Sequence, residues 1–228
     1  MAEVLVVVEA SAAAGVKKVT LEMLTIARTL GSPSAVVFGS VDTAKLAEFG
    51  AARVYTVDDP EVEKYLVAPK ATVLANLVKE KQPFAVLIAS TQEGKEIAGR
   101  LAVKLDNGLL VDAVDVAEDG TATQAVFAGS TIVKSKVTKG IPLITIRPNS
   151  VTPEPAASHG AAHHFAGGFQ KQSFSDAARQ AFADGGRQIS SRGARPGFDE
   201  RQGDLVGERR AVAFAEPFRR RLGRVTVV

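Results

Sequence analysis

Residues 84–105 read FAVLIASTQEGKEIAGRLAVKL, an apolar run, a polar loop and an amphipathic segment in direct succession. The run Phe84–Ala89 is apolar throughout, which is typical of a parallel strand covered on both faces. The following segment, Glu93–Leu105, places Ile97 and Leu101 on one face of a helix. A buried strand that leads straight into a helix is the repeating unit of an α/β sheet, so this stretch predicts that fold class.

The same unit recurs along the first hundred residues. Further strands are expected at Val4–Val8, Ala35–Phe38 and Arg53–Val57, and helices at Val19–Leu30, Asp42–Phe49 and Pro69–Lys81. Beyond residue 105 the helices stop, and strands are expected at Leu109–Val116, Thr121–Phe127, Thr131–Val137 and Leu143–Arg147. This order predicts an α/β fold with a mainly parallel Rossmann-like sheet, helices on both faces and an antiparallel strand extension.

The composition divides the chain near Ala157. Residues 1–157 hold 12 of the 13 lysines and only 4 of the 15 arginines, whereas residues 158–228 hold 11 arginines and all three histidines. The first part has a net charge of −2 and the second of +5. We therefore expect a folded domain over 1–150, and an Arg-rich tail over 151–228 that is disordered or irregular and forms no second domain.

Several classes of protein are disfavoured by what the sequence lacks. There is no cysteine, which excludes disulfides and thiolate chemistry and suits a reducing compartment. The start MAEVLVVVEA has no basic segment before its apolar run, and no apolar run approaches the roughly 18–20 residues that span a bilayer. These features predict a soluble, intracellular protein without membrane insertion.

The loop Ser90–Glu96 is the main candidate site, and it has two interpretations. It follows a strand and opens a helix, where α/β sheets bind ligands. Ser90, Thr91 and the amide of Gly94 could hold an anion, with Lys95 adding charge. Alternatively the loop only caps the helix, with Thr91 or Ser90 accepting from free amides. It lacks the first glycine of a P-loop.

Other polar residues predict less chemistry. Gly15 stands alone, so the glycine fingerprint of dinucleotide-binding folds is absent. Asp112 and Asp115 are three positions apart, and on a regular strand they face opposite sides, which disfavours a carboxylate pair. No catalytic residue is predicted.

Two basic features also have plain explanations. Lys134 and Lys136 alternate with Val133 and Ser135, as on one exposed face of a strand. The adjacent pair His163–His164 has no third ligand nearby and is weak support for a metal site, so none is predicted.

Several stretches together resemble the N-terminal domain of the electron transfer flavoprotein alpha subunit. They are MAEVLVVVE at 1–9, TLEMLTIAR at 20–28, STQEGKEIAGRLAVKL at 90–105, GLLVDAVDV at 108–116 and FAGSTIVKSKVTKGIPLITIRPNSVTPEP at 127–155. The likeness covers about residues 1–157 in order, and the sequence of this part is similar to that of actinobacterial members.

The resemblance implies a nucleotide-hydrolase-like α/β domain that packs against a beta subunit in a heterodimer. In that family a second domain of the alpha subunit holds FAD. The complex carries electrons from acyl-CoA and other dehydrogenases to a membrane quinone oxidoreductase. The family is thus an electron carrier and not an enzyme with its own substrate.

The tail departs from the family pattern. Gly185-Gly186-Arg187 resembles a fragment of the family's flavin-binding turn, but no apolar strand precedes it. No FAD-contacting residue is therefore assigned here, and this chain is expected to bind no FAD and to be inactive alone.

One hypothesis explains the tail through the genetic code. Pro196–Val212, PGFDERQGDLVGERRAV, can be read one nucleotide later as PDLTSAKVI followed by Ser-Gly, which resembles the family's entry into its FAD domain. The tail would then be an out-of-frame translation that begins near 150–165. In the alternative, the tail is a selected basic arm for nucleic acid, attached to a stand-alone nucleotide-binding α/β module.

Overall fold

The computed structural model describes residues 2–11, 15–58, 62 and 65–156, and the backbone of two strands at 161–164 and 225–227. All of these residues belong to one compact unit. The expected absence of a folded domain over 151–228 falls mostly on residues outside this description, and it stays a prediction.

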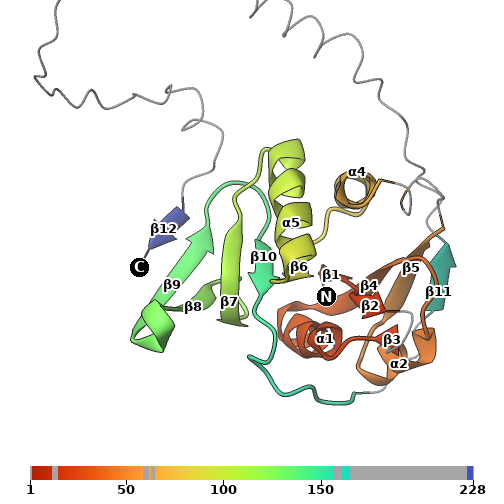
Figure 1. Cartoon of the computed structure of the whole chain (residues 1–228), viewed down its shortest axis with the longest axis horizontal. Helices are drawn as coiled ribbons and strands as arrows, with labels where there is room; N and C mark the ends of the chain where they lie inside the picture. The colour runs from red at the N-terminus through yellow and green to blue at the C-terminus, as the bar shows by residue number, and fades with distance from the viewer. Residues whose placement is uncertain are drawn as a thin grey trace, which may run out of the picture. The chain divides into compact units, whose positions relative to one another are not determined.

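The strands and helices of the first hundred residues alternate as expected (Figure 1). The helices are α1 (Lys18–Leu30), α2 (Thr43–Glu48), α4 (Val67–Lys81) and α5 (Gln92–Leu105). The strands between them are β1 (Glu3–Val7), β4 (Ser32–Phe38), β5 (Arg53–Val57) and β6 (Ala85–Ala89). Two short strands, β2 (Ala10–Ser11) and β3 (Gly15–Val16), form a separate antiparallel pair.

The second half adds β7 (Leu110–Val116), β8 (Ala122–Val126), a 3-10 turn η1 (Phe127–Gly129), β9 (Thr131–Val137) and β10 (Leu143–Ile146). Two further strands, β11 (Ala161–His164) and β12 (Val225–Val227), pair with β5 and β9. Among the described residues the main sheet runs β11-β5-β4-β1-β6-β10-β7-β8-β9-β12. Pairing is parallel from β11 to β7 and antiparallel from β7 to β12.

The position of β10 corrects the sequence interpretation. We expected it among the strands of the antiparallel extension, because no helix precedes it. Instead β10 returns to the centre and lies parallel to both β6 and β7. The antiparallel extension that remains is the meander β7-β8-β9. The alternation predicted for β9 is confirmed, because Lys134 and Lys136 are exposed and Ser135 between them is buried.

Helices cover both faces of the parallel part, as predicted. On β1, Val4 and Val6 belong to the core shared with Met23 and Leu24 of α1. The alternate residues Leu5 and Val7 belong to the core shared with α4 and α5. Every residue of β6 is buried, which accounts for its continuous apolar run. Within the described residues, no helix combines the length and apolar character needed to cross a membrane.

The Glu3 carboxylate links three strands near their amino-terminal ends, whereas the candidate loop lies at the carboxyl ends. Glu3 Oε1 accepts hydrogen bonds from the Ser34 hydroxyl at 2.6 Å and the Tyr55 hydroxyl at 2.8 Å. Arg53 Nη1 lies 3.3 Å from the same oxygen. Burial of Tyr55, followed by its hydrogen bond to Glu3, raises the pKa of the phenol from 10.0 to about 12.

This raised pKa predicts a measurable alkaline transition. The neutral phenol is favoured in the folded state, so its contribution to stability is complete below pH 10 and is lost as the pH rises toward 12. A difference titration of tyrosinate absorbance between the wild-type chain and Tyr55→Phe should show the Tyr55 transition near pH 12. A transition at the ordinary value would contradict the buried Tyr55–Glu3 contact.

Candidate functional site at the carboxyl edge of the sheet

The fold places one ligand-binding position by its topology. From β1 the chain adds β4 and β5 on one side, whereas β6 lies on the other side of β1. The carboxyl ends of β1 and β6 therefore flank the point where the strand order reverses. In open α/β sheets, ligands bind in the crevice at such a point. The predicted loop Ser90–Glu96 lies at this crevice.

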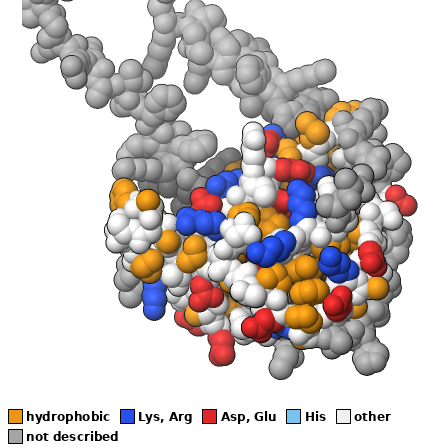
Figure 2. Space-filling view, turned by 60° about the horizontal axis from the view of Figure 1, so that its bottom comes forward, with side chains coloured by type: hydrophobic (Ala, Val, Ile, Leu, Met, Phe, Trp, Pro, Cys, Tyr) orange, Lys and Arg blue, Asp and Glu red, His pale blue; other side chains and the backbone are white. Residues whose placement is uncertain are grey.

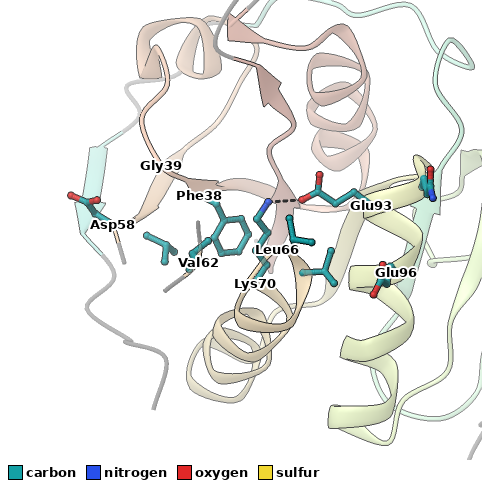
Figure 3. Close-up of a pocket in the computed structure, with 11 residues that line it drawn as sticks. Phe38, Gly39, Asp58, Val62, Leu66, Lys70, Glu93 and Glu96 are labelled. Atoms are coloured by element: carbon teal, nitrogen blue, oxygen red, sulfur yellow. Dashed lines mark hydrogen bonds and ion pairs between the residues drawn. The ribbon is translucent and has the colours of Figure 1, made fainter. Parts of the chain in front are cut away.

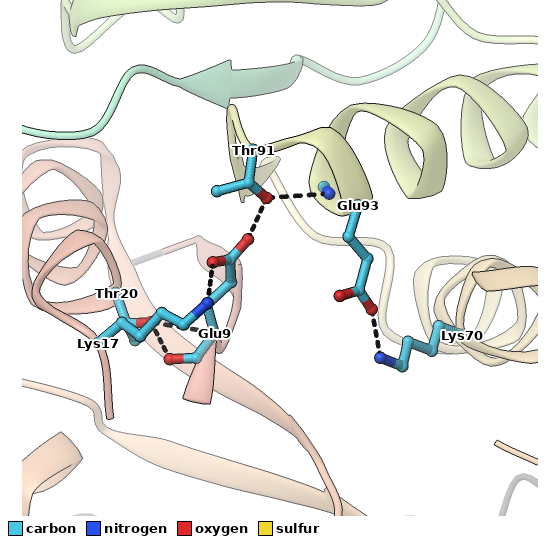
Figure 4. Close-up of polar contacts among 7 residues, drawn as sticks. Glu9, Lys17, Thr20, Lys70, Thr91 and Glu93 are labelled. Carbon is cyan, nitrogen blue, oxygen red and sulfur yellow. Dashed lines mark hydrogen bonds and ion pairs between the residues drawn. The ribbon is translucent and has the colours of Figure 1, made fainter. Parts of the chain in front are cut away.

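The crevice is filled by the chain's own side chains (Figure 4). Glu9, just after β1, accepts a hydrogen bond from the Thr91 hydroxyl through Oε1. Its other oxygen, Oε2, lies 3.2 Å from Lys17 Nζ. The Thr20 hydroxyl accepts from the Glu9 amide at 2.9 Å and donates to the Glu9 carbonyl at 3.1 Å. The remaining cavity measures about 90 Å³, well below the roughly 300–1,000 Å³ of typical ligand pockets.

The loop makes the capping contact that the sequence allowed. Thr91 Oγ1 accepts from the amide of Gly94 at 3.1 Å and so caps α5. Gly94 packs so closely on β6 that a Cβ placed there would lie 2.0 Å from the Ala89 carbonyl oxygen. The hydroxyl and the amide that the anion interpretation requires are therefore bonded to each other in this structure.

The other two candidate residues meet at Asp112. The Ser90 hydroxyl donates to Asp112 Oδ1 at 2.5 Å and lies 3.0 Å from Thr145 Oγ1. Lys95 Nζ lies 3.1 Å from the same carboxylate. Partial burial alone would raise the pKa of Asp112, but the bonds from Ser90 and Lys95, with the charge of Arg147, lower it below 3.8 overall. The structure thus brings all four candidates together, each engaged with a partner.

Asp112 also departs from regular strand geometry. Its φ is 60°, and the pairing register of β7 with β10 shifts between Leu110 and Ala113, the stretch that contains Asp112. The assumption that Asp112 and Asp115 alternate on a regular strand was therefore wrong. The two carboxylates still have different partners, since Asp115 Oδ1 accepts from the neighbouring Val116 amide at 2.9 Å.

A larger hollow of about 620 Å³ opens beside the crevice, above the ends of β4 and β5 (Figure 3). Its apolar lining comes from Phe38, Val57, Val62, Leu66 and Val67. Lys70, on its wall, is 2.5 Å from Glu93 and lies over the Phe38 ring at 5.8 Å from the centroid. Asp58, Glu93 and Glu96 also line it, so the hollow is a poor match for a phosphate.

Metal and nucleic-acid binding find no support in the described part of the chain. No group of three metal-ligating side chains occurs there, and the side chains of His163 and His164 lie outside the description. Lys136 is paired with Asp119 at 2.9 Å. Figure 2 shows Lys and Arg side chains interspersed with Asp, Glu and hydrophobic ones on the face that it presents, without a continuous basic patch.

The switch point of this Rossmann-like α/β domain is occupied by the domain's own hydrogen-bonded side chains. The chain belongs to the electron transfer flavoprotein family, because residues 4–165 match the model of the electron transfer flavoprotein domain.

Several similar proteins of known sequence are electron transfer flavoprotein alpha subunits. The chain is 47% identical over 165 residues to electron transfer flavoprotein subunit alpha of Mycobacterium tuberculosis (strain H37Rv). The aligned region covers 70% of this chain and 52% of that protein. It is 44% identical to the Mycobacterium leprae subunit alpha over the same shares. The Syntrophomonas wolfei subunit alpha is 39% identical over 140 residues, 58% of this chain and 44% of that protein. The resemblance found in the sequence is confirmed, and the chain spans about half the length of these curated relatives.

Proposed function

We propose that this chain supplies the N-terminal scaffold domain of an electron transfer flavoprotein alpha subunit and docks on a beta subunit. It acts as part of an electron carrier and turns over no substrate of its own. The assembled carrier would take electrons from acyl-CoA and other dehydrogenases and pass them to a quinone oxidoreductase in the membrane. The proposed location is the bacterial cytoplasm.

One observation carries this proposal: the matched residues coincide with an α/β sheet covered by helices on both faces, and in its described residues Glu9 and Thr91 fill the switch point between β1 and β6. The family match extends over 4–165. Within it, Glu9 and Thr91 close the position where such folds bind ligands. A domain of this kind contributes packing surfaces, so its function lies in assembly.

Docking is tested by co-expression with a tagged beta subunit from the same genome. We expect the chain to co-elute in constant ratio at both low and high ionic strength. The salt comparison matters because the 11 arginines of residues 158–228 could produce non-specific attachment, and attraction between exposed charges is screened by salt. Elution of a folded chain away from the beta subunit at both salt concentrations would contradict the proposal.

Titration with AMP and ATP distinguishes the proposed function from the alternative, a stand-alone nucleotide-binding module. The scaffold proposal predicts no saturable binding heat, because Glu9 occupies the crevice. Saturable binding that is lost in Thr91→Val would favour the nucleotide module. The out-of-frame hypothesis for the tail remains separate, and resequencing the gene from codon 140 onward tests it.

A further inference from the structure

The segment after β10 does not leave the domain directly. Residues 147–156, here called the strap, run from β10 along α1 toward α2 (Figure 1). The Asn149 amide donates to Glu22 Oε2 at 2.9 Å, and the Glu154 amide to Thr25 Oγ1 at 3.1 Å. The Ala156 amide donates to the Glu48 carbonyl at 2.9 Å. The strap is thus attached at three points, two on α1 and one on α2.

The first attachment uses an unusual side chain. The Glu22 side chain is fully buried, and Oε1 has no hydrogen-bond partner among the described residues. Its charge is balanced by Lys18, whose Nζ lies 3.3 Å from Oε1 and also donates to Asn149 Oδ1 at 3.0 Å. Glu22 and Lys18 therefore hold the backbone and the side chain of the same strap residue.

Burying a carboxylate costs free energy unless it is paired, and well-packed apolar replacements of buried ion pairs are often neutral or stabilising. General stability is therefore a weak explanation for a fully buried Glu22 on α1. Its direct hydrogen bond goes to the strap, 127 residues away in sequence. A buried charge that bonds one remote backbone amide specifies where that backbone lies.

The strap has restricted conformational freedom. Pro148, Pro153 and Pro155 restrict its backbone and remove competing amide donors. Its start is fixed by Arg147, whose Nη2 donates to the Ala125 carbonyl of β8 at 3.0 Å, and by the Ser150 hydroxyl, which donates to the Arg147 carbonyl at 2.7 Å. Few conformations remain to be lost when the strap docks, so a few hydrogen bonds suffice to order it.

We propose that Glu22 is a positioning residue that holds the strap on α1 and so sets where the chain after residue 156 begins. The anchoring itself rests only on the contacts above. Its use rests on the proposed function, since in an alpha subunit the strap leads by way of β11, which pairs with β5, toward the following domain, and its course sets how the chain reaches β11.

Hydrogen exchange of the full chain, followed by mass spectrometry, tests the anchoring. In Glu22→Ala we expect exchange in peptides of residues 147–156 to accelerate roughly ten- to a hundredfold, as for loss of a hydrogen bond to a charged group. Peptides of β1 and β6 should be unchanged. Glu22→Gln keeps an acceptor for the Asn149 amide and should restore most of the protection.

Two further variants secure the interpretation. Glu80→Ala removes an exposed carboxylate on α4 that is paired with its neighbour Lys81, so the strap should exchange as in the wild type. If Glu22→Ala does not fold, Glu22→Met fills the same volume without charge and should show the same local acceleration. Unchanged strap exchange in a folded variant, or an equal acceleration in strap and core, would overturn the proposal. Because the chain is measured alone, failure to dock on a beta subunit leaves this result intact.

Discussion

Replacing Gly94 with alanine is expected to lower the free energy of unfolding by about 3 kcal/mol, at the upper end for overpacking. The added Cβ would lie 2.0 Å from the Ala89 carbonyl oxygen and 3.1 Å from Thr91 Oγ1. Neither neighbour can yield easily, since the former is backbone of a fully buried strand and the latter caps α5. To relieve the clash, the first turn of α5 must move away from β6 and loosen the Glu9–Thr91 contact.

Gly99→Ala is the matched control, because Gly99 lies in the same helix and nothing is within 4 Å of its added Cβ. Alanine in an open helical position should raise the free energy of unfolding by roughly 0.5–1 kcal/mol. Chemical denaturation of both variants gives the comparison. Equal effects of the two substitutions would show that the close approach of α5 to β6 does not contribute to the free energy of unfolding.

The alternation of strands and helices could be predicted because it depends on local patterns. Continuous apolar runs indicated strands buried on both faces, and the spacing of Val73, Leu74 and Leu77 indicated one buried face of α4. The central place of β10 was missed, although its four residues are all buried and lack the alternation of β9. That contrast between an uninterrupted apolar strand and an alternating one was a usable signal for parallel and antiparallel neighbours.

The site was harder to predict because its contacts are long-range. The cap of α5 could be recognised from the sequence, because Gly94 follows Thr91 by three residues, the spacing of an N-cap side chain and the amide that it accepts from. Glu9 lies 82 residues from Thr91, and no local pattern pairs them. Its place directly after β1 was nevertheless a signal, because residues at the ends of parallel strands gather at one edge. Asp112 could not be placed, since its left-handed conformation interrupts the two-residue period of the strand.

The purified chain is expected to carry no flavin. The family resemblance of the sequence implies that a second domain of the alpha subunit holds FAD, whereas the match to the family domain here covers residues 4–165. Within the described residues, the crevice between β1 and β6 measures only about 90 Å³. The larger hollow over β4 and β5 is lined by three carboxylates and one lysine, and because Lys70 is paired with Glu93, the remaining negative charge disfavours the pyrophosphate of FAD.

The measurement is the visible absorbance spectrum of the chain, recorded alone and with a co-expressed beta subunit, and repeated after incubation with excess FAD and desalting. No flavin band is expected in the chain alone, and a dehydrogenase reduced by its own substrate should transfer no electrons to it. If only the beta-subunit sample retained FAD, the scaffold would be completing a site on its partner, and docking would stand. A reducible flavin retained by the chain alone would contradict the scaffold proposal, because residues outside the described domain would then have to form the site.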